Sequence, residues 1–358
     1  MSIITNKYSS AYSRTSAIFN KIIGEGTINW PALALARFLL SFIVVAAHIL
    51  EFTDTPSPFA WLNRFGGFNA ILGFLLISGL SIGKSIQQNP QGYHRRRAQR
   101  VYPVYLASIA LQYIVLQEGF GWKLLLVLLA NIFFLNQVVT DTSYVGPAWT
   151  LALEVWLYAL APLFLRLSFK VLLALTLASF GSYLAYTCAR TLVHAPYYAG
   201  VSYGLNLVFL SFIWVAGFML ALFEKKQKKI SFLIAALLFT HWASTFAIQL
   251  AYRVKNNQLS TANIREDLTN FTMEAICLGL VYYVVIANRH IPPFSAVTKR
   301  AVNLLGNISY PLYLSHFTVL ILCRNLAIHH WALLAVSCLV VAALIYWIFD
   351  FYSKKRVA

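Results

Sequence analysis

The sequence predicts an all-α membrane protein, a polytopic bundle of about ten spanning helices with one further apolar segment that is partial or re-entrant. Hydrophobic residues make up 59% of the 358 positions and charged residues only 11%, whereas soluble domains carry about 25% charged residues. Long apolar segments also follow one another from residue 33 to residue 349, without a linker long enough to separate two domains. A soluble fold of this length would lack the charged surface that it needs.

Each apolar segment is expected to form one helix of the bundle. A helix needs about 20 residues to cross about 30 Å of hydrocarbon, so the shorter segments are marginal. In chain order, the segments are 33–50, 66–84, 101–117, 122–138, 149–166, 171–189, 204–223, 231–250, 271–287, 303–324 and 331–349.

The basic residues predict how the chain is threaded. Although the net charge is +17, the cations cluster in short loops between apolar segments. This pattern is typical of the positive-inside bias and does not indicate nucleic-acid binding. The loops expected in the cytoplasm are 84–100, 224–229, 288–300 and the end at 353–356.

This threading requires an even number of crossings between residues 101 and 223, where five apolar segments lie. One of them therefore does not cross, and the candidates are 101–117 and 122–138. Both termini are then expected in the cytoplasm.

The chain is expected to form one membrane domain with two tails. Residues 1–30 predict a cytoplasmic tail, residues 31–350 the membrane domain, and residues 351–358 a basic cytoplasmic tail. The four cysteines lie in or beside apolar segments without a CxxC spacing, so no disulfide and no metal site is expected.

Two ionisable residues, Arg37 and His48, lie in the first apolar segment. Ionisable groups are costly in hydrocarbon and usually face a bundle interior or a wet cavity. Their spacing of eleven residues turns both side chains to within about 20° of one face, about 16 Å apart along the axis. The alternative is an anchor at the membrane edge (Arg37) and a hydrogen-bonded packing histidine (His48).

A basic run ends in Arg97 and Arg100, and Tyr105 follows in the same cluster. Arginines three residues apart on a helix share a face and can hold a phosphate or pyrophosphate with paired hydrogen bonds. The alternative is a basic patch that fixes topology and contacts anionic lipid.

A glutamate, Glu154, lies inside the segment that begins at Trp149. A buried carboxylate is costly unless it is paired or protonated, and Tyr158, one turn later, can bond to it on the same face. A structural ion pair with an arginine is the alternative.

Two further clusters interrupt the apolar pattern. Ser309, Tyr313 and His316 fall near one helical face and can line the cavity that His48 faces. Ser78 and Gly79 belong to a stretch of small residues that permits close approach of a helix or a ligand. Both clusters are also compatible with simple packing, because such residues often join membrane helices.

Taken in chain order, the five clusters resemble the motifs of the membrane acyltransferase 3 family, from about residue 30 to about residue 350. The sequence departs from the family pattern at Thr150, where serine is usual, and at Asp350, where many members carry a Glu-x-Pro element. The residues that match are Arg37, His48, Phe74, Ser78, Gly79, Arg97, Arg100, Pro103, Tyr105, Trp149, Glu154, Tyr158, Pro162, Gly306, Ser309, Tyr310, Tyr313 and His316.

The resemblance implies an integral-membrane O-acyltransferase that moves an acetyl group from cytoplasmic acetyl-CoA to a carbohydrate hydroxyl. The acceptor would be a lipopolysaccharide O-antigen, an exopolysaccharide or another glycan at the bacterial inner membrane, with no obligatory protein partner. The expected donor-binding residues are Arg97, Arg100 and Tyr105.

His48 is the expected general base, because an imidazole titrates near neutral pH. Glu154 is expected to orient it, and Arg37 is the third expected catalytic residue, which the donor's pantetheine arm would pass on its way to His48. The expected substrate-binding residues are Ser78, Trp149, Tyr158, Ser309, Tyr313 and His316.

A proton-coupled transporter or a flippase for lipid-linked sugars is the alternative function, with His48, Glu154 and His316 as a proton relay. The chain shows no internal repeat and no pair of broken helices. This alternative also leaves the Arg97 and Arg100 pair without a task.

Overall fold

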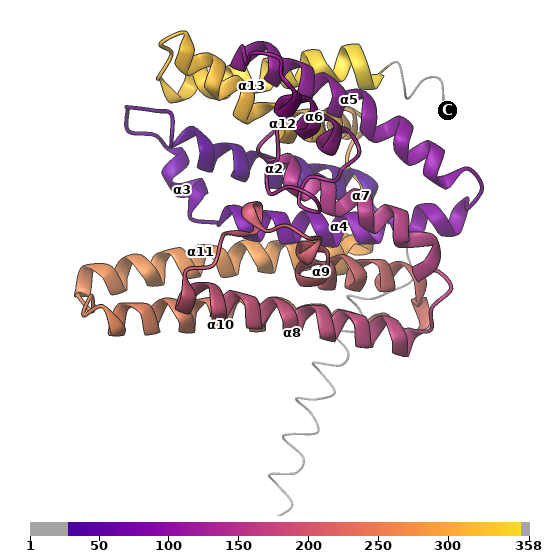
Figure 1. Ribbon diagram of the computed structural model, residues 1–358. Coiled ribbons are helices and arrows are strands. Elements are labelled where there is room, and N and C mark those ends of the chain that lie inside the picture. Colours follow the sequence, from indigo (N-terminus) through magenta and orange to yellow (C-terminus); the bar gives the residue numbers. More distant parts are fainter. Residues whose placement is uncertain (1–27, 352–358) are drawn as a thin grey trace, which may run out of the picture.

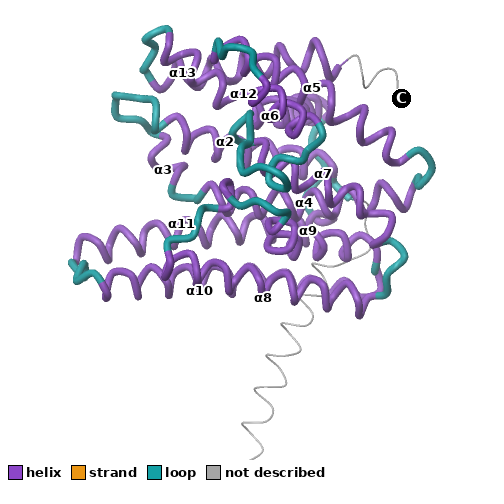
Figure 2. The backbone as a smooth tube through the Cα atoms, in the orientation of Figure 1, coloured by secondary structure: helices purple, strands orange, loops and turns teal. Residues whose placement is uncertain are grey.

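The computed structural model describes residues 28–351, and within this range the chain forms helices and no β-strand (Figure 2). The predicted tails fall almost entirely on residues 1–27 and 352–358, which lie outside the described range. The all-α prediction is confirmed.

The long helices lie roughly side by side in layers (Figure 1). α2 and α4 form the middle of the bundle, with α12 packed on α2 from one side and α9 packed on α4 from the other. In chain order, the α-helices are α2 (Trp30–Ile49), α3 (Phe59–Asn63), α4 (Gly67–Gln88), α5 (Tyr93–Leu116), α6 (Trp122–Ile132), α7 (Ala148–Phe164), α8 (Phe169–Val193), α9 (Leu205–Leu222), α10 (Gln227–Lys255), α11 (Thr261–Ile286), α12 (Ala296–Asn325) and α13 (Trp331–Ile345). Short turns of helix are η1 (Tyr198–Gly200), η2 (Glu224–Lys226), η3 (Asn288–His290) and η4 (Tyr346–Phe351).

The protein is a multi-pass membrane protein. Within the described residues, seven helical stretches are long and apolar enough to span a bilayer. The predicted total of ten crossings remains a prediction, because other helices of the bundle are shorter or carry more charge. The spanning stretches are Trp30–Ile49, Gly67–Gln88, Phe169–Val193, Leu205–Leu222, Glu224–Lys255, Thr261–Ile286 and Trp331–Phe349.

The apolar segment 122–138 is the one that falls short. Its helix, α6, has only 11 residues, which is about 16 Å of helix against about 30 Å of hydrocarbon. The other candidate, 101–117, belongs to the 24-residue helix α5. We infer that α6 does not cross the bilayer.

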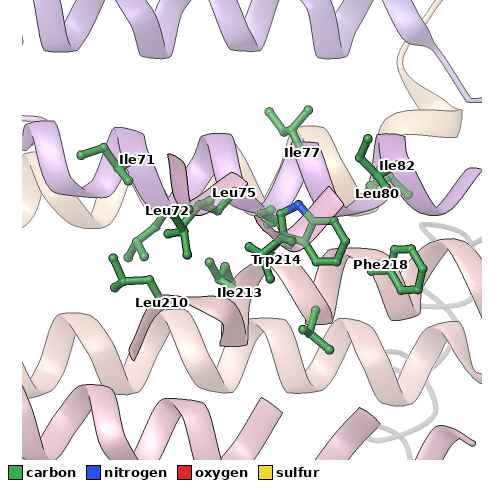
Figure 3. Close-up of a cluster of buried hydrophobic side chains, with 14 of the residues drawn as sticks. Ile71, Leu72, Leu75, Ile77, Leu80, Ile82, Leu210, Ile213, Trp214 and Phe218 are labelled. Carbon is green, nitrogen blue, oxygen red and sulfur yellow. The ribbon is translucent and has the colours of Figure 1, made fainter. Parts of the chain in front are cut away.

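Glycines allow α4 and α9 to pack backbone against backbone. A Cβ atom at Gly79 would lie 2.0 Å from the carbonyl oxygen of Trp214, and one at Gly217 would lie 2.2 Å from that of Leu76. Figure 3 shows the side chains of this interface, with Trp214 beside α4. The contact fixes the face of α4 that carries Ser78, because Trp214 Nε1 donates a hydrogen bond to Ser78 Oγ at 3.2 Å.

A second close contact joins α2 and α12. A Cβ atom at Gly306 would lie 2.5 Å from the Cβ atom of Ala34, and Ser41 Oγ donates to the carbonyl oxygen of Ser309 at 3.0 Å. The approach brings the polar face of α12 next to the face of α2 that carries Arg37.

Candidate active site

A cavity of about 300 Å³ lies among α2, α4, α5, α7 and α12. Its wall includes most of the residues that the sequence singles out, although they come from five separate helices. The predicted site residues that line it are Arg37, Ser78, Arg97, Arg100, Glu154, Tyr158, Ser309 and Tyr313.

Hydroxyl groups hold the carboxylate of Glu154 in this cavity. Ser78 Oγ donates to Glu154 Oε2 at 2.7 Å, and the Tyr158 hydroxyl donates to the same oxygen. Tyr158 is available because it lies one turn further along α7. In the described part of the chain, no ion pair joins Glu154 to an arginine, so the structural ion pair is not formed.

Serines on α4 hold two of the guanidinium groups. Arg97 Nη2 donates to Ser85 Oγ at 2.7 Å, and Arg37 Nη2 lies 3.5 Å from Ser81 Oγ. The Nε atoms of Arg37 and Arg97 are buried and have no hydrogen-bond partner within residues 28–351. A buried donor without a partner costs about 1–3 kcal/mol, so an anion that accepts from these atoms would stabilise the site.

The charge of the cavity also favours an anion. Three guanidinium groups, those of Arg37, Arg97 and Arg100, line its wall together with the single carboxylate of Glu154. Guanidinium groups present their donors in a planar fork that matches the oxygens of phosphate. The arrangement is therefore suited to a ligand that carries phosphate groups.

His48 and His316 form a separate pair that does not line this cavity. Their ring centroids lie 5.3 Å apart. His48 lies near the end of α2 opposite Trp30, its side chain is 32% exposed, and its Nδ1 atom lies 3.1 Å from Glu51 Oε1. The carboxylate at His48 is therefore Glu51, and the expectation that Glu154 orients His48 is wrong, because Glu154 is engaged in the arginine-lined cavity.

The hydrogen bonds of His316 determine its tautomer. Its Nδ1 atom lies 3.1 Å from the Leu312 carbonyl oxygen and 2.8 Å from that of Tyr313. Because both partners only accept, we assign the proton of the neutral ring to Nδ1. The Nε2 atom then carries a free lone pair, and it is buried without a partner in the described part of the chain.

Tyr313 connects the two parts of the site. Its ring lines the cavity and lies 6.2 Å from the ring of His316. Its hydroxyl lies 2.8 Å from Thr150 Oγ1, and its ring packs edge-on against Phe74. The structure thus divides the predicted site into an arginine-lined cavity and a histidine pair, with Tyr313 between them.

Two predicted site residues lie outside both parts. Tyr105 is fully buried, donates to the carbonyl oxygen of Asn131 at 3.0 Å and stacks on Phe134. It attaches α5 to the end of α6, which is a structural contact. Trp149 is 6% exposed and packs edge-on against Tyr197, so neither side chain reaches the cavity.

Sequence reasoning overlooked Glu51, Ser81 and Ser85. Glu51 lies three residues after His48, a spacing that places two helical side chains together. Ser81 and Ser85 continue from Ser78 at intervals of three and four residues, which puts all three serines on one face of α4. Both signals were present in the sequence, although each is common in helices without a site.

No group of three or more His, Cys, Asp or Glu side chains placed to hold a metal ion occurs within residues 28–351.

Comparison with known proteins supports the interpretation of the chain as an enzyme. It is 25% identical over 296 residues to the "Putative acetyltransferase ORF330" of Acidianus two-tailed virus, a match that covers 80% of this chain and 82% of the viral protein. No solved structure matches the chain. The family model described as an acyltransferase domain matches residues 30–350, which is nearly the whole chain. The chain therefore belongs to the acyltransferase 3 family, and it is an acyltransferase.

Proposed function

We propose that this acyltransferase moves an acetyl group from acetyl-CoA to a hydroxyl of a cell-surface or lipid-linked carbohydrate. One observation supports the choice of donor. Arg37, Arg97 and Arg100 converge on one cavity, and two of their Nε atoms have no hydrogen-bond partner among the described residues. Coenzyme A carries several phosphate groups, and guanidinium groups bind phosphate through charge-assisted hydrogen bonds.

The donor enters from the cytoplasm in this proposal. Arg97 and Arg100 lie in the first turns of α5 and belong to the basic stretch 84–100, and basic stretches beside membrane helices stay on the cytoplasmic side. Both chain termini are then cytoplasmic, and the membrane is the bacterial inner membrane.

His48 is the proposed general base. It takes the proton of the acceptor hydroxyl as that oxygen attacks the thioester carbonyl carbon, the carbon–sulfur bond breaks, and the proton passes to the leaving thiolate. Glu51, at 3.1 Å from Nδ1, is placed to stabilise the imidazolium form, as the carboxylate of a catalytic triad does. Arg37 shares the face of α2 with His48 and lies on the donor side.

The acceptor reaches the site from the face opposite the basic loops. His48 lies near the end of α2 opposite Trp30 and its side chain is partly exposed, so a substrate outside the bilayer can contact it. Tyr313 and Ser309 line the cavity from α12, where their hydroxyl groups can bond to a sugar.

A binding measurement tests the donor assignment. The affinity of acetyl-CoA is measured for the purified protein in nanodiscs, for wild type and for the Arg97→Ala/Arg100→Ala variant. Arg95→Ala is the matched control, because Arg95 lies on the same helix but is exposed and does not line the cavity. We expect wild type and Arg95→Ala to bind, and the double variant to lose at least tenfold in affinity.

Absence of binding to wild type would refute the acetyl-CoA assignment. The proton-relay alternative gains no support from the geometry, because Glu154 bonds to Ser78 and Tyr158 in the cavity, whereas the histidine pair lies beyond Tyr313.

A further inference from the structure

Trp30 stands at the mouth of the arginine-lined cavity. It is the first residue of α2, it lines the cavity together with Arg97 and Arg100, and it is 40% exposed. A tryptophan at the end of a membrane helix often serves as an interfacial anchor. Three features of its surroundings indicate a more specific role.

The backbone immediately before Trp30 is held by hydrogen bonds of Asn29. The Asn29 amide donates to Asn288 Oδ1 at 2.6 Å, and the Asn288 side-chain amide donates back to the Asn29 carbonyl oxygen at 3.2 Å. Asn29 also donates to the carbonyl oxygen of Ile291 and caps α2 through the Ala32 amide. These hydrogen bonds fix the position of the backbone from which the exposed indole projects. A lipid anchor does not require such a fixed position.

Trp30 is also aligned with the anion-binding groups. It lies seven residues before Arg37 on α2, which places both side chains on one helical face about 10 Å apart along the axis. The buried Nε atoms of Arg37 and Arg97, which have no partner within residues 28–351, are free to bind an anion in this cavity. A ligand whose phosphates meet these arginines can therefore extend along the same face to the indole.

The size of the cavity places the rest of such a ligand at the mouth. A volume of about 300 Å³ is at the lower limit for sites that enclose drug-sized molecules. A coenzyme A thioester consists of a long pantetheine arm and an adenine nucleotide, which together exceed that size. The arm fits the interior, and the nucleotide remains at the entrance, where Trp30 is exposed.

Resting on the acetyl-CoA donor proposed above, we propose that Trp30 stacks on the adenine ring of the donor and makes the enzyme selective for acyl-coenzyme A. An acyl group carried on phosphopantetheine alone, as on a carrier protein, lacks this base. Stacking of a base on an aromatic side chain changes affinity by about tenfold or more. The indole thus distinguishes two donors that share the same reactive thioester.

Binding of two donors to four proteins in nanodiscs tests this role. The ligands are acetyl-CoA and S-acetyl-phosphopantetheine, and the proteins are wild type, Trp30→Ala, Trp30→Phe and Trp61→Ala. Trp61 is the matched control, because it is a more exposed tryptophan on α3 that packs on Arg64 and does not line the cavity. Size-exclusion profiles establish that each variant is folded.

We expect Trp30→Ala to lose about tenfold or more in affinity for acetyl-CoA and to bind acetyl-phosphopantetheine as wild type does. Trp30→Phe should retain most of the preference, and Trp61→Ala all of it. Equal loss for both ligands, or no loss for either, would overturn the role of Trp30 while leaving the donor assignment intact. If wild type binds neither ligand, the proposed donor itself is wrong, and the stacking role falls with it.

Discussion

The hydroxyl of Tyr313 lies 2.8 Å from Oγ1 of Thr150, a contact that joins α12 to α7 where the arginine-lined cavity ends. The ring of Tyr313 faces Phe74 on one helix and His316 on its own helix. In the proposed mechanism, the thioester in the cavity and the acceptor at His48 lie on opposite sides of this ring. The bond to Thr150 would then hold the ring in place as a barrier between donor and base.

Removing that bond should loosen the barrier. Tyr313→Phe keeps the ring but loses a hydrogen bond with a net value of about 0.5–1.5 kcal/mol, which corresponds to an increase of about two- to tenfold in the open population. We expect acetyl-CoA affinity to be unchanged and the release of free CoA without an acceptor to rise by this factor. A thiol assay measures the release.

Tyr186→Phe is the control for Tyr313→Phe, because its hydroxyl bonds to the Pro196 carbonyl oxygen away from the cavity. An unchanged rate of CoA release in Tyr313→Phe would mean that this ring does not limit passage.

His316 should matter for activity and not for stability. Replacement by leucine removes a buried Nε2 atom that has no partner in the described chain, and such an atom costs about 1–3 kcal/mol. The carbonyl groups that its Nδ1 atom contacts belong to residues inside α12. After the replacement they can still accept the backbone hydrogen bonds of the helix. We expect His316→Leu to leave the thermal midpoint unchanged or raise it, while acetyl transfer falls at least tenfold.

Thermal unfolding in detergent and a transfer assay on the same preparation check this pair of effects. A lower midpoint together with normal transfer would assign His316 to packing alone.

The sequence was sufficient for the fold class and for much of the cavity. Helical spacing placed Tyr158 with Glu154, and the cost of buried charge singled out Arg37. These inferences concern single helices, where spacing fixes which side chains share a face.

Contacts between side chains of different helices were harder to predict from the sequence. Glu154 and His48 are both ionisable, and both lie in apolar segments of the sequence. Only the packing of α7 against α4 shows that Glu154 bonds to Ser78 and not to the histidine. The sequence also did not decide which of segments 101–117 and 122–138 fails to cross, because the composition of 122–138 does not show that its helix ends at Ile132.

The glycine contact between α4 and α9 should be essential for the site. A methyl group at Gly79 would collide with the backbone of Trp214, and neither backbone can yield as a flexible side chain does. Overpacking costs about 1–3 kcal/mol, and the forced separation would move Ser78 away from Glu154. We expect Gly79→Ala to lower the thermal midpoint and to reduce transfer.

Gly181→Ala is the matched control, because among the described residues no atom from outside its own stretch of helix lies within 4 Å of the added methyl group, and the residue is also inside a helix. It should be neutral or stabilising by about 0.5–1 kcal/mol. Equal midpoints for the two variants would contradict the close packing at Gly79.

The contact between His48 and Glu51 gives the most direct test of the chemistry. A general base contributes about 10²- to 10⁴-fold to a rate, so His48→Ala should abolish measurable transfer while the protein stays folded and inserted. Glu51→Gln keeps the shape and a hydrogen-bond acceptor but removes the charge that stabilises the imidazolium, so it should lower kcat and leave KM for acetyl-CoA unchanged.

Asp54→Asn is the control for Glu51→Gln, because Asp54 is an exposed carboxylate on the same loop that lies 3.7 Å from His329 and not at His48. Steady-state kinetics with a soluble glycan acceptor separates the cases: wild-type kcat in Glu51→Gln would exclude the carboxylate from the reaction, and wild-type transfer in His48→Ala would refute the base itself.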